Sequence, residues 1–142
     1  MSIESKKKIL VVDDDADFVE SVSLFLEHNN FTVLKARDGS QGLKLARMEK
    51  PDLILMDVMM NERTEGFFTV QEIRRTPELA ATPIFILSAL YETQAGFRVK
   101  PQSSWLAHDE FIAKPVDMQA LLEKIRARLG ARQAAAFPAE GA

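Results

Sequence analysis

Short apolar runs alternate along the chain with longer segments in which apolar residues recur at helical spacing. The apolar runs predict buried strands at 8–12, 31–36, 52–56, 83–88 and 110–113. The periodic segments predict helices at 16–28, from the end of the turn at 38–40 to about 50, around 68–74, and from 118 to a stop at Gly130. The alternation of the two patterns indicates an α/β protein.

Strands that alternate with helices are typical of a parallel sheet that is covered by helices on both faces. Five strands suit the flavodoxin-like order 2-1-3-4-5, in which ligands bind at the carboxyl ends of the strands. We therefore expect one α/β domain over residues 1–130, followed by a flexible C-terminal tail over 131–142.

Composition is ordinary for a globular protein and excludes several classes of function. The 142 residues carry a net charge of −3, which argues against a nucleic-acid-binding surface. The chain has no cysteine, so disulfides and thiolate metal sites are excluded. The apolar run at 9–12 is too short for a signal peptide or a membrane span, and we expect a cytoplasmic protein.

Polar residues lie where four of the predicted strands end. Asp13 and Asp14 follow the first strand, Asp57 follows the third, Ser88 ends the fourth and Lys114 follows the fifth. Because the carboxyl ends of parallel strands meet at one edge of a sheet, we expect these side chains to converge. Each residue alone would be explained as a turn, a helix cap or a strand-end group, so the convergence is what indicates a site.

The converging groups suit phosphoryl transfer. Asp13, Asp14 and Asp57 would pool up to three negative charges, which a Mg²⁺ ion bound by carboxylate oxygens would offset. Lys114 and the Ser88 hydroxyl can donate hydrogen bonds to an anionic oxygen. A carboxylate can attack phosphorus and form an acyl phosphate. Asp57 is the best candidate for this nucleophile because it follows the central strand, whereas Asp13 and Asp14 are better suited to hold the metal.

Four motifs, in this order, resemble those of the receiver domains of two-component response regulators. They are Val11-Val-Asp-Asp14, Leu55-Met-Asp-Val-Met-Met60, Leu87-Ser-Ala89 and Phe111-Ile-Ala-Lys-Pro115. The resemblance spans about residues 7–130. It implies a stand-alone, single-domain signalling switch of a two-component system or phosphorelay, and not an enzyme. Such a switch has no DNA-binding domain and no membrane segment, and it acts through contacts with a downstream protein that the sequence does not identify.

The resemblance also implies a role for each residue of the metal site. Asp57 is the phosphoacceptor and receives the phosphoryl group from the phosphohistidine of a sensor histidine kinase or a phosphotransfer protein. The cofactor is Mg²⁺, which lies between Asp57 and the acidic pair Asp13 and Asp14. The backbone carbonyl of Met59 is a further metal ligand.

Three other residues match the positions that respond to phosphorylation in the family. Ser88 takes the place of the switch hydroxyl, Lys114 that of the pairing lysine, and Phe111 that of the switch aromatic, which tends to turn inward. A phosphoryl group adds about −1.5 to −2 charges and three acceptor oxygens, towards which Ser88 and Lys114 can move. The resemblance therefore implies two alternative packings of the fourth and fifth strand ends.

Two segments depart from the family pattern. Asn61 stands where many members have a proline, and the loop between it and Gly66 is one residue longer. The segment 90–108, where the family has its fourth helix, contains Pro101, and a proline inside a helix costs about 3 kcal/mol. We expect that helix to be short, beginning near 103–104, or to be replaced by a loop. We interpret the aromatic residues of the segment as packing on the sheet, with a partner-binding patch as the alternative.

Two other functions stay open. One is the hydrolysis of small phosphorylated molecules through an aspartyl phosphate. Such enzymes usually carry a second acid two residues beyond the nucleophile, where this chain has Met59. The other is a scaffold receiver that is never phosphorylated, and the intact set of polar residues argues against it.

Overall fold

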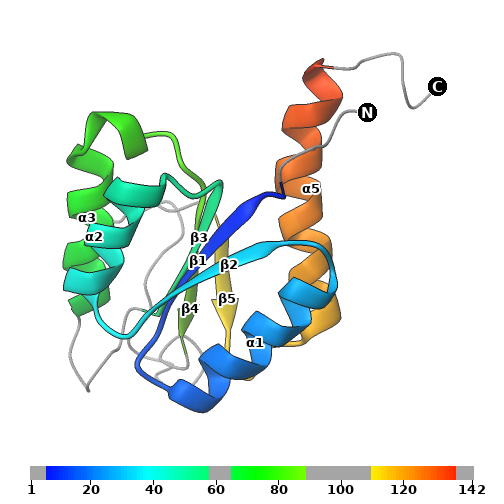
Figure 1. Ribbon diagram of the computed structural model, residues 1–142, viewed down its shortest axis with the longest axis horizontal. Coiled ribbons are helices and arrows are strands. Elements are labelled where there is room, and N and C mark those ends of the chain that lie inside the picture. The colour runs from blue at the N-terminus through cyan, green and yellow to red at the C-terminus, as the bar shows by residue number, and fades with distance from the viewer. Residues whose placement is uncertain (1–5, 58–64, 89–109, 137–142) are drawn as a thin grey trace.

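The computed structural model describes residues 6–57, 65–88 and 110–136, which form a sheet with helices on both faces (Figure 1). The strands are β1 (Lys8–Val12), β2 (Thr32–Ala36), β3 (Leu53–Asp57), β4 (Ile84–Ser88) and β5 (Glu110–Ala113). The helices are α1 (Ala16–His28), α2 (Gly39–Glu49), α3 (Glu65–Arg75), the short 3₁₀ helix η2 (Pro77–Leu79) and α5 (Met118–Ala136). All five predicted strands are confirmed, with ends that differ by at most one residue from the prediction.

The five strands are parallel and lie in the order β2-β1-β3-β4-β5. The flavodoxin-like order that the sequence predicts is therefore confirmed. The register pairs Val12 of β1 with Met56 of β3, so the two central strands end level with each other. The carboxyl edge of the sheet, where both strands end, lies at the bottom of Figure 1.

Two apolar clusters cover the two faces of the sheet, because successive side chains of a strand point to opposite faces. Helices α2 and α3 pack on one face against residues such as Leu10, Ile54 and Ile86. Helices α1 and α5 pack on the other face against residues such as Ile9 and Leu55. All five of these strand residues are fully buried, as expected of a parallel sheet with both faces covered.

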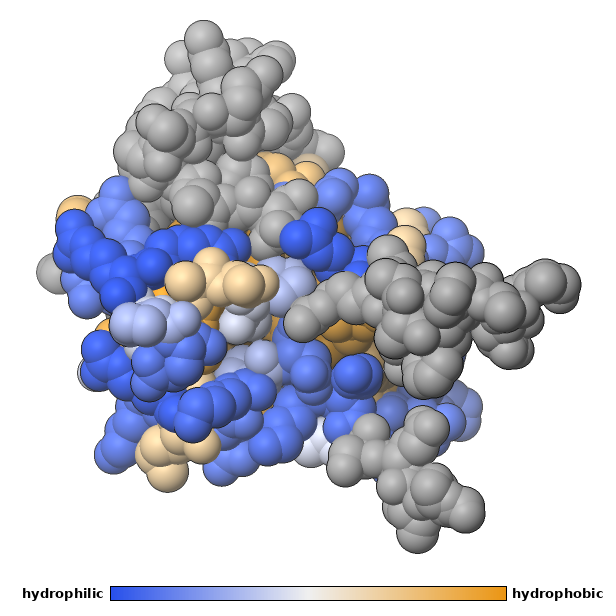
Figure 2. All heavy atoms as spheres, turned by 90° about the horizontal axis from the view of Figure 1, so that it is seen from above, coloured by the Kyte–Doolittle hydropathy of each residue, from blue (hydrophilic) through white to orange (hydrophobic). Residues whose placement is uncertain are grey.

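The surface seen from the amino ends of the strands is mainly hydrophilic (Figure 2). Apolar residues show on this face only in small, scattered groups among the residues that are coloured. Large apolar side chains that are exposed include Leu24 of α1, Met48 of α2 and Phe68 of α3. Within the described part of the chain, no helix is both long enough and apolar enough to cross a membrane.

The last helix is longer than the sequence predicts. Gly130 is predicted to end it, but α5 continues to Ala136, so this prediction is wrong. Gly130 does not adopt a positive φ. The six residues after it are four alanines, an arginine and a glutamine, all strong helix formers, which outweigh the cost of one glycine. The division between domain and tail at residue 130, and the flexibility of the tail, stay predictions.

Two expectations fall on parts of the chain outside the described residues. They are the short or missing helix within 90–108 and the altered loop that begins at Asn61. Both stay predictions.

Ser23 is a buried polar residue on α1, and its replacement by alanine is expected to stabilise the fold by about 1 kcal/mol. Ser23 is fully buried, and its Oγ has no hydrogen-bond partner within the described residues. Ser21 on the same helix is exposed, so Ser21→Ala reports the difference in helix propensity alone. Urea unfolding of both variants measures the difference between their free energies of unfolding. A Ser23→Ala variant that is less stable than the parent would show that the hydroxyl has a partner.

Candidate functional site

The acidic residues lie together because two neighbouring strands end beside each other. Asp57 is the last residue of β3, and Asp13 directly follows β1, whose Val12 pairs with Met56. Both aspartates are buried, with Asp13 1% and Asp57 6% exposed. Asp14 is exposed beside them, and one carboxylate oxygen from each of the three residues lies within 4.8 Å of the others. The convergence expected from the sequence is confirmed for these three side chains.

Backbone contacts hold the turn that carries Asp13. The backbone N–H of Asp13 donates to the carbonyl oxygen of Ala36 at the end of β2 (3.1 Å). The Asp13 Oδ1 accepts a hydrogen bond from the backbone N–H of Asp15 (3.0 Å). The Asp15 side chain in turn caps α1 by accepting from the N–H groups of Asp17 and Phe18. The start of α1 therefore fixes the orientation of the Asp13 carboxylate.

Lys114 supplies a positive charge inside this acidic group. It follows β5, and its Nζ lies 2.7 Å from Asp13 Oδ2 and 3.6 Å from Asp57 Oδ2. The ammonium group also lies over the Phe18 ring, 4.6 Å from the ring centroid, where a cation–π interaction is favourable. The side chain of Lys114 is 20% exposed, and the peptide bond between Lys114 and Pro115 is cis. The strand end and the α1 ring therefore hold the ammonium group against both buried carboxylates.

The pKa of Lys114 reports how strongly the carboxylates act on it. Burial alone would lower this pKa, because it disfavours the charged form. The hydrogen bond to Asp13 and the negative charges of Asp57 and Asp13 outweigh burial, so the pKa lies above its ordinary value. Lys114 is therefore charged throughout the neutral pH range.

Acidic side chains outnumber basic ones at this site among the described residues. Three carboxylates lie together with one ammonium group in a partly buried space. Hard oxygen ligands that are this close fit a hard divalent cation such as Mg²⁺. The donor set of Asp13, Asp14 and Asp57 therefore suits a metal of this class.

The remaining candidates from the sequence are only partly described. Ser88 ends β4 and pairs with Ala113 of β5, which places its backbone at the carboxyl edge beside Lys114, but its side chain is not described. Phe111 lies in β5, half-buried and packed against the apolar cluster on the side of α2 and α3. Met59 lies outside the described residues.

Two residues of the site were not anticipated. The ring of Phe18, an apolar residue of α1, lies beneath the Lys114 ammonium group. Asp15 was not assigned to the site, yet it orients Asp13 through a backbone hydrogen bond and caps the helix. The run of acidic residues before a predicted helix indicates the cap. No local sequence pattern indicates that residue 18 contacts residue 114.

Comparison with known proteins places the chain in a family. Residues 9–126 match the sequence model of the response regulator receiver domain. The protein PilH of Pseudomonas aeruginosa is 34% identical over 122 residues, which are 86% of this chain and 97% of PilH. The chemotaxis protein CheY4 of Vibrio cholerae superposes with a TM-score of 0.73 at 26% identity, covering 86% of this chain and 98% of CheY4.

Some relatives are longer proteins. The DNA-binding dual master transcriptional regulator RpaA of Synechocystis is 35% identical over 122 residues, but this chain spans only 48% of its length. The similarity to such a relative therefore covers only part of that relative's chain. The match of 9–126 to the family, the nearly complete coverage of PilH and the shared fold show that the chain belongs to the response regulator receiver domains of two-component systems.

Proposed function

We propose that this receiver domain is switched by phosphorylation of Asp57, with Mg²⁺ as cofactor. The observation that supports this most strongly is the cluster of Asp13, Asp14 and Asp57, whose carboxylate oxygens lie within 4.8 Å of one another. Lys114 lies close to two of them and offers a cation to the same space. Phosphoryl transfer needs chiefly a positioned nucleophile and positive charge around the phosphoryl oxygens, and these residues offer both.

The proposed donor is the phosphohistidine of a sensor histidine kinase or a phosphotransfer protein. A carboxylate oxygen of Asp57 attacks phosphorus, so an O–P bond forms while the P–N bond to the histidine breaks. The electron pair of the broken bond stays on the imidazole nitrogen. The product is an aspartyl phosphate on this chain and a free histidine on the donor. The other ring nitrogen of the phosphohistidine carries a proton, so the imidazole leaves as a neutral ring and the step balances.

The metal would be held by the side chains of Asp13, Asp14 and Asp57 and by the backbone carbonyl of Met59. When bound, Mg²⁺ supplies positive charge that offsets the carboxylates and the phosphoryl oxygens. In the chain itself, the Lys114 ammonium group pairs with Asp13 Oδ2, and the N–H of Asp15 holds the same carboxylate in place. Both oxygens of the Asp13 carboxylate already accept a hydrogen bond, one from Lys114 and one from Asp15, which leaves Asp57 as the proposed nucleophile. Asp13 and Asp14 are proposed to serve as metal ligands.

Lys114 and Ser88 are proposed to detect the product. The Lys114 Nζ is 3.6 Å from Asp57 Oδ2, so a phosphoryl group on Asp57 would compete with Asp13 for the ammonium group. The Ser88 hydroxyl is proposed to move towards the same oxygens. Phe111, which is half-buried on the neighbouring strand, is proposed to turn inward when this happens. The resulting change of surface would be recognised by a downstream protein.

The first test is a chemical one. With Mg²⁺ and acetyl phosphate, the intact mass of the chain is expected to rise by one phosphoryl group, as acetate leaves. EDTA is expected to abolish the adduct, because it removes the divalent cation that would offset the carboxylates and the incoming phosphoryl oxygens. Asp57→Asn is expected to give no adduct. An adduct that forms equally well in EDTA would contradict the proposed role of Mg²⁺, and one that persists in Asp57→Asn would contradict the proposed acceptor.

A further inference from the structure

A groove runs along one side of α2 and the turn that precedes this helix. It has a volume of about 690 Å³ and is lined by Arg37, Asp38, Ser40, Gln41, Lys44, Leu45 and Met48. Five of these seven residues are exposed and the other two are half-buried, so the groove is open along its length. An open groove encloses too little of a small molecule to bind it well, and it is better suited to an extended surface of a macromolecule.

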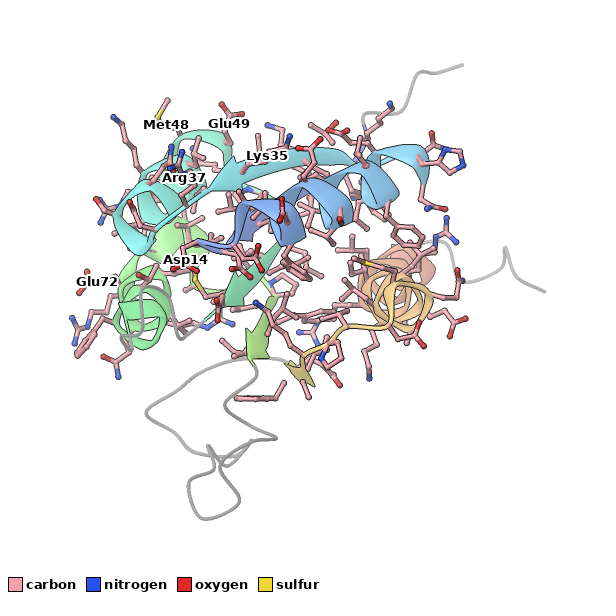
Figure 3. All side chains as sticks on the ribbon, turned by 90° about the horizontal axis from the view of Figure 1, so that it is seen from below. Asp14, Lys35, Arg37, Met48, Glu49 and Glu72 are labelled. Carbon is pink, nitrogen blue, oxygen red and sulfur yellow. The ribbon has the colours of Figure 1, made fainter. Side chains whose placement is uncertain are left out.

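The helical part of the lining forms one stripe. Gln41, Lys44, Leu45 and Met48 are spaced by three and four residues, so they follow one side of α2. Figure 3 shows Met48 on the same side of α2 as Arg37, pointing away from α3. The Met48 side chain is 63% exposed, which is unusual for a large apolar residue. Methionine is flexible and polarisable, and it adapts to varied apolar partners.

The charge of this region is opposite to that of the rest of the chain. Residues 35–50 contain five basic and two acidic residues, a net charge of +3, whereas the whole chain carries −3. The remaining residues therefore sum to −6. The two basic residues of the lining, Arg37 and Lys44, form no ion pair with the residues that the structure describes.

The region contains two acidic residues, and each of them has a partner. Glu49 pairs with Lys8 at 3.3 Å, outside the lining of the groove. Asp38 caps α2 by accepting a hydrogen bond from the backbone N–H of Gln41 (2.8 Å). Asp38 keeps its own charge in the lining, but the cations Arg37 and Lys44 outnumber it there and lie along the same groove as the apolar Leu45 and Met48.

We propose that this groove is a docking surface for an acidic segment of a partner protein that carries an apolar anchor residue. Glutamate or aspartate side chains of the segment would pair with Arg37 and Lys44, while the anchor would contact Met48 and Leu45. Charge complementarity identifies the occupant. A basic groove attracts an acidic segment and repels a basic one. None of the residues that line the groove belongs to the acidic cluster, and the proposal goes beyond the proposed function.

The test is a selection of peptides from a random twelve-residue library against the immobilised chain. Peptides enriched by the selection are expected to carry several acidic residues around an apolar residue. Lys44→Glu and Met48→Ser are each expected to weaken their binding at least fivefold in fluorescence anisotropy. The matched controls are Lys6→Glu, which reverses another exposed lysine, and Leu24→Ser, which removes another exposed apolar side chain on α1. Both controls are expected to bind like the parent.

Several outcomes would overturn the proposal. These are a selection that enriches no peptide, peptides without acidic residues, or binding that Lys44→Glu and Met48→Ser leave unchanged. Single-stranded RNA or phosphatidylserine vesicles serve as a further comparison. If either binds the parent in a manner that depends on Lys44 while the peptides do not, the groove recognises another anion and the proposal is wrong. Thermal unfolding of each variant separates loss of binding from loss of fold.

Discussion

Lys114→Met is expected to lower the free energy of unfolding by about 3 kcal/mol in metal-free buffer, because it leaves a buried charge without its partner. Asp13 is 1% exposed and its carboxylate lies 2.7 Å from the Lys114 ammonium group. Methionine keeps most of the volume of the lysine side chain, so the change removes mainly the charge. Urea unfolding in EDTA measures the loss.

Lys124→Met is a matched control for this experiment. Lys124 pairs with one carboxylate, that of Glu110 at 3.0 Å, and the two side chains are 46% and 39% exposed. Solvent screens such a pair, so the expected loss is under about 1 kcal/mol. The double variant Asp13→Asn/Lys114→Met is expected to recover most of the stability. Equal losses for Lys114→Met and Lys124→Met would show that the buried pair is not the cause.

Gly42→Ala is expected to destabilise the fold by about 2 kcal/mol, although alanine is the better helix former. Gly42 lies on α2 where the helix approaches β1 most closely. A Cβ at this position would lie 2.8 Å from Val12 Cγ2 and 3.1 Å from Val12 Cγ1. Valine is stiff at χ1 and fully buried, so the helix has to shift. Because Val12 precedes Asp13, the shift would act directly beside the acidic cluster.

Gly130→Ala gives the comparison for this prediction. Gly130 is also inside a helix, but a Cβ there would meet no atom within 4 Å, so the expected result is a gain of up to about 1 kcal/mol. The overlap between the new Cβ and Val12 predicts that the stability losses of two variants are not additive. Val12→Ala removes the two methyl groups that the new Cβ meets, so the double variant should lose less stability than the two single losses added together. Additive losses would place the strain elsewhere.

The order of the elements and the convergence of the acidic residues could be predicted because both depend on local patterns. Buried parallel strands are short apolar runs, and a polar residue directly after such a run lies at the carboxyl edge of the sheet. Asp13, Asp57 and Lys114 each satisfy that rule, so the rule brings them together without any knowledge of their contacts. The family resemblance added the roles, which the geometry alone does not assign.

Other features depend on contacts between distant residues. The sequence indicates that Lys114 lies near the aspartates, but only the structure shows that Asp13 is its closer partner and that the Phe18 ring lies beneath it. The close approach of Gly42 to Val12 likewise needs the packing of a helix on a strand. The wrong helix end at Gly130 has a different cause, since one glycine is a weak signal against a following run of helix formers.

The position of the phosphoryl group tests the proposed switch most directly. The chain is treated with acetyl phosphate and Mg²⁺, and the product is reduced with borohydride, which converts an aspartyl phosphate into homoserine. Peptide mass mapping then identifies the converted residue. Phosphorylation as proposed predicts homoserine at position 57 and at no other position. Homoserine at position 13 or 14, a phosphate that survives reduction on another kind of residue, or no adduct at all would contradict it.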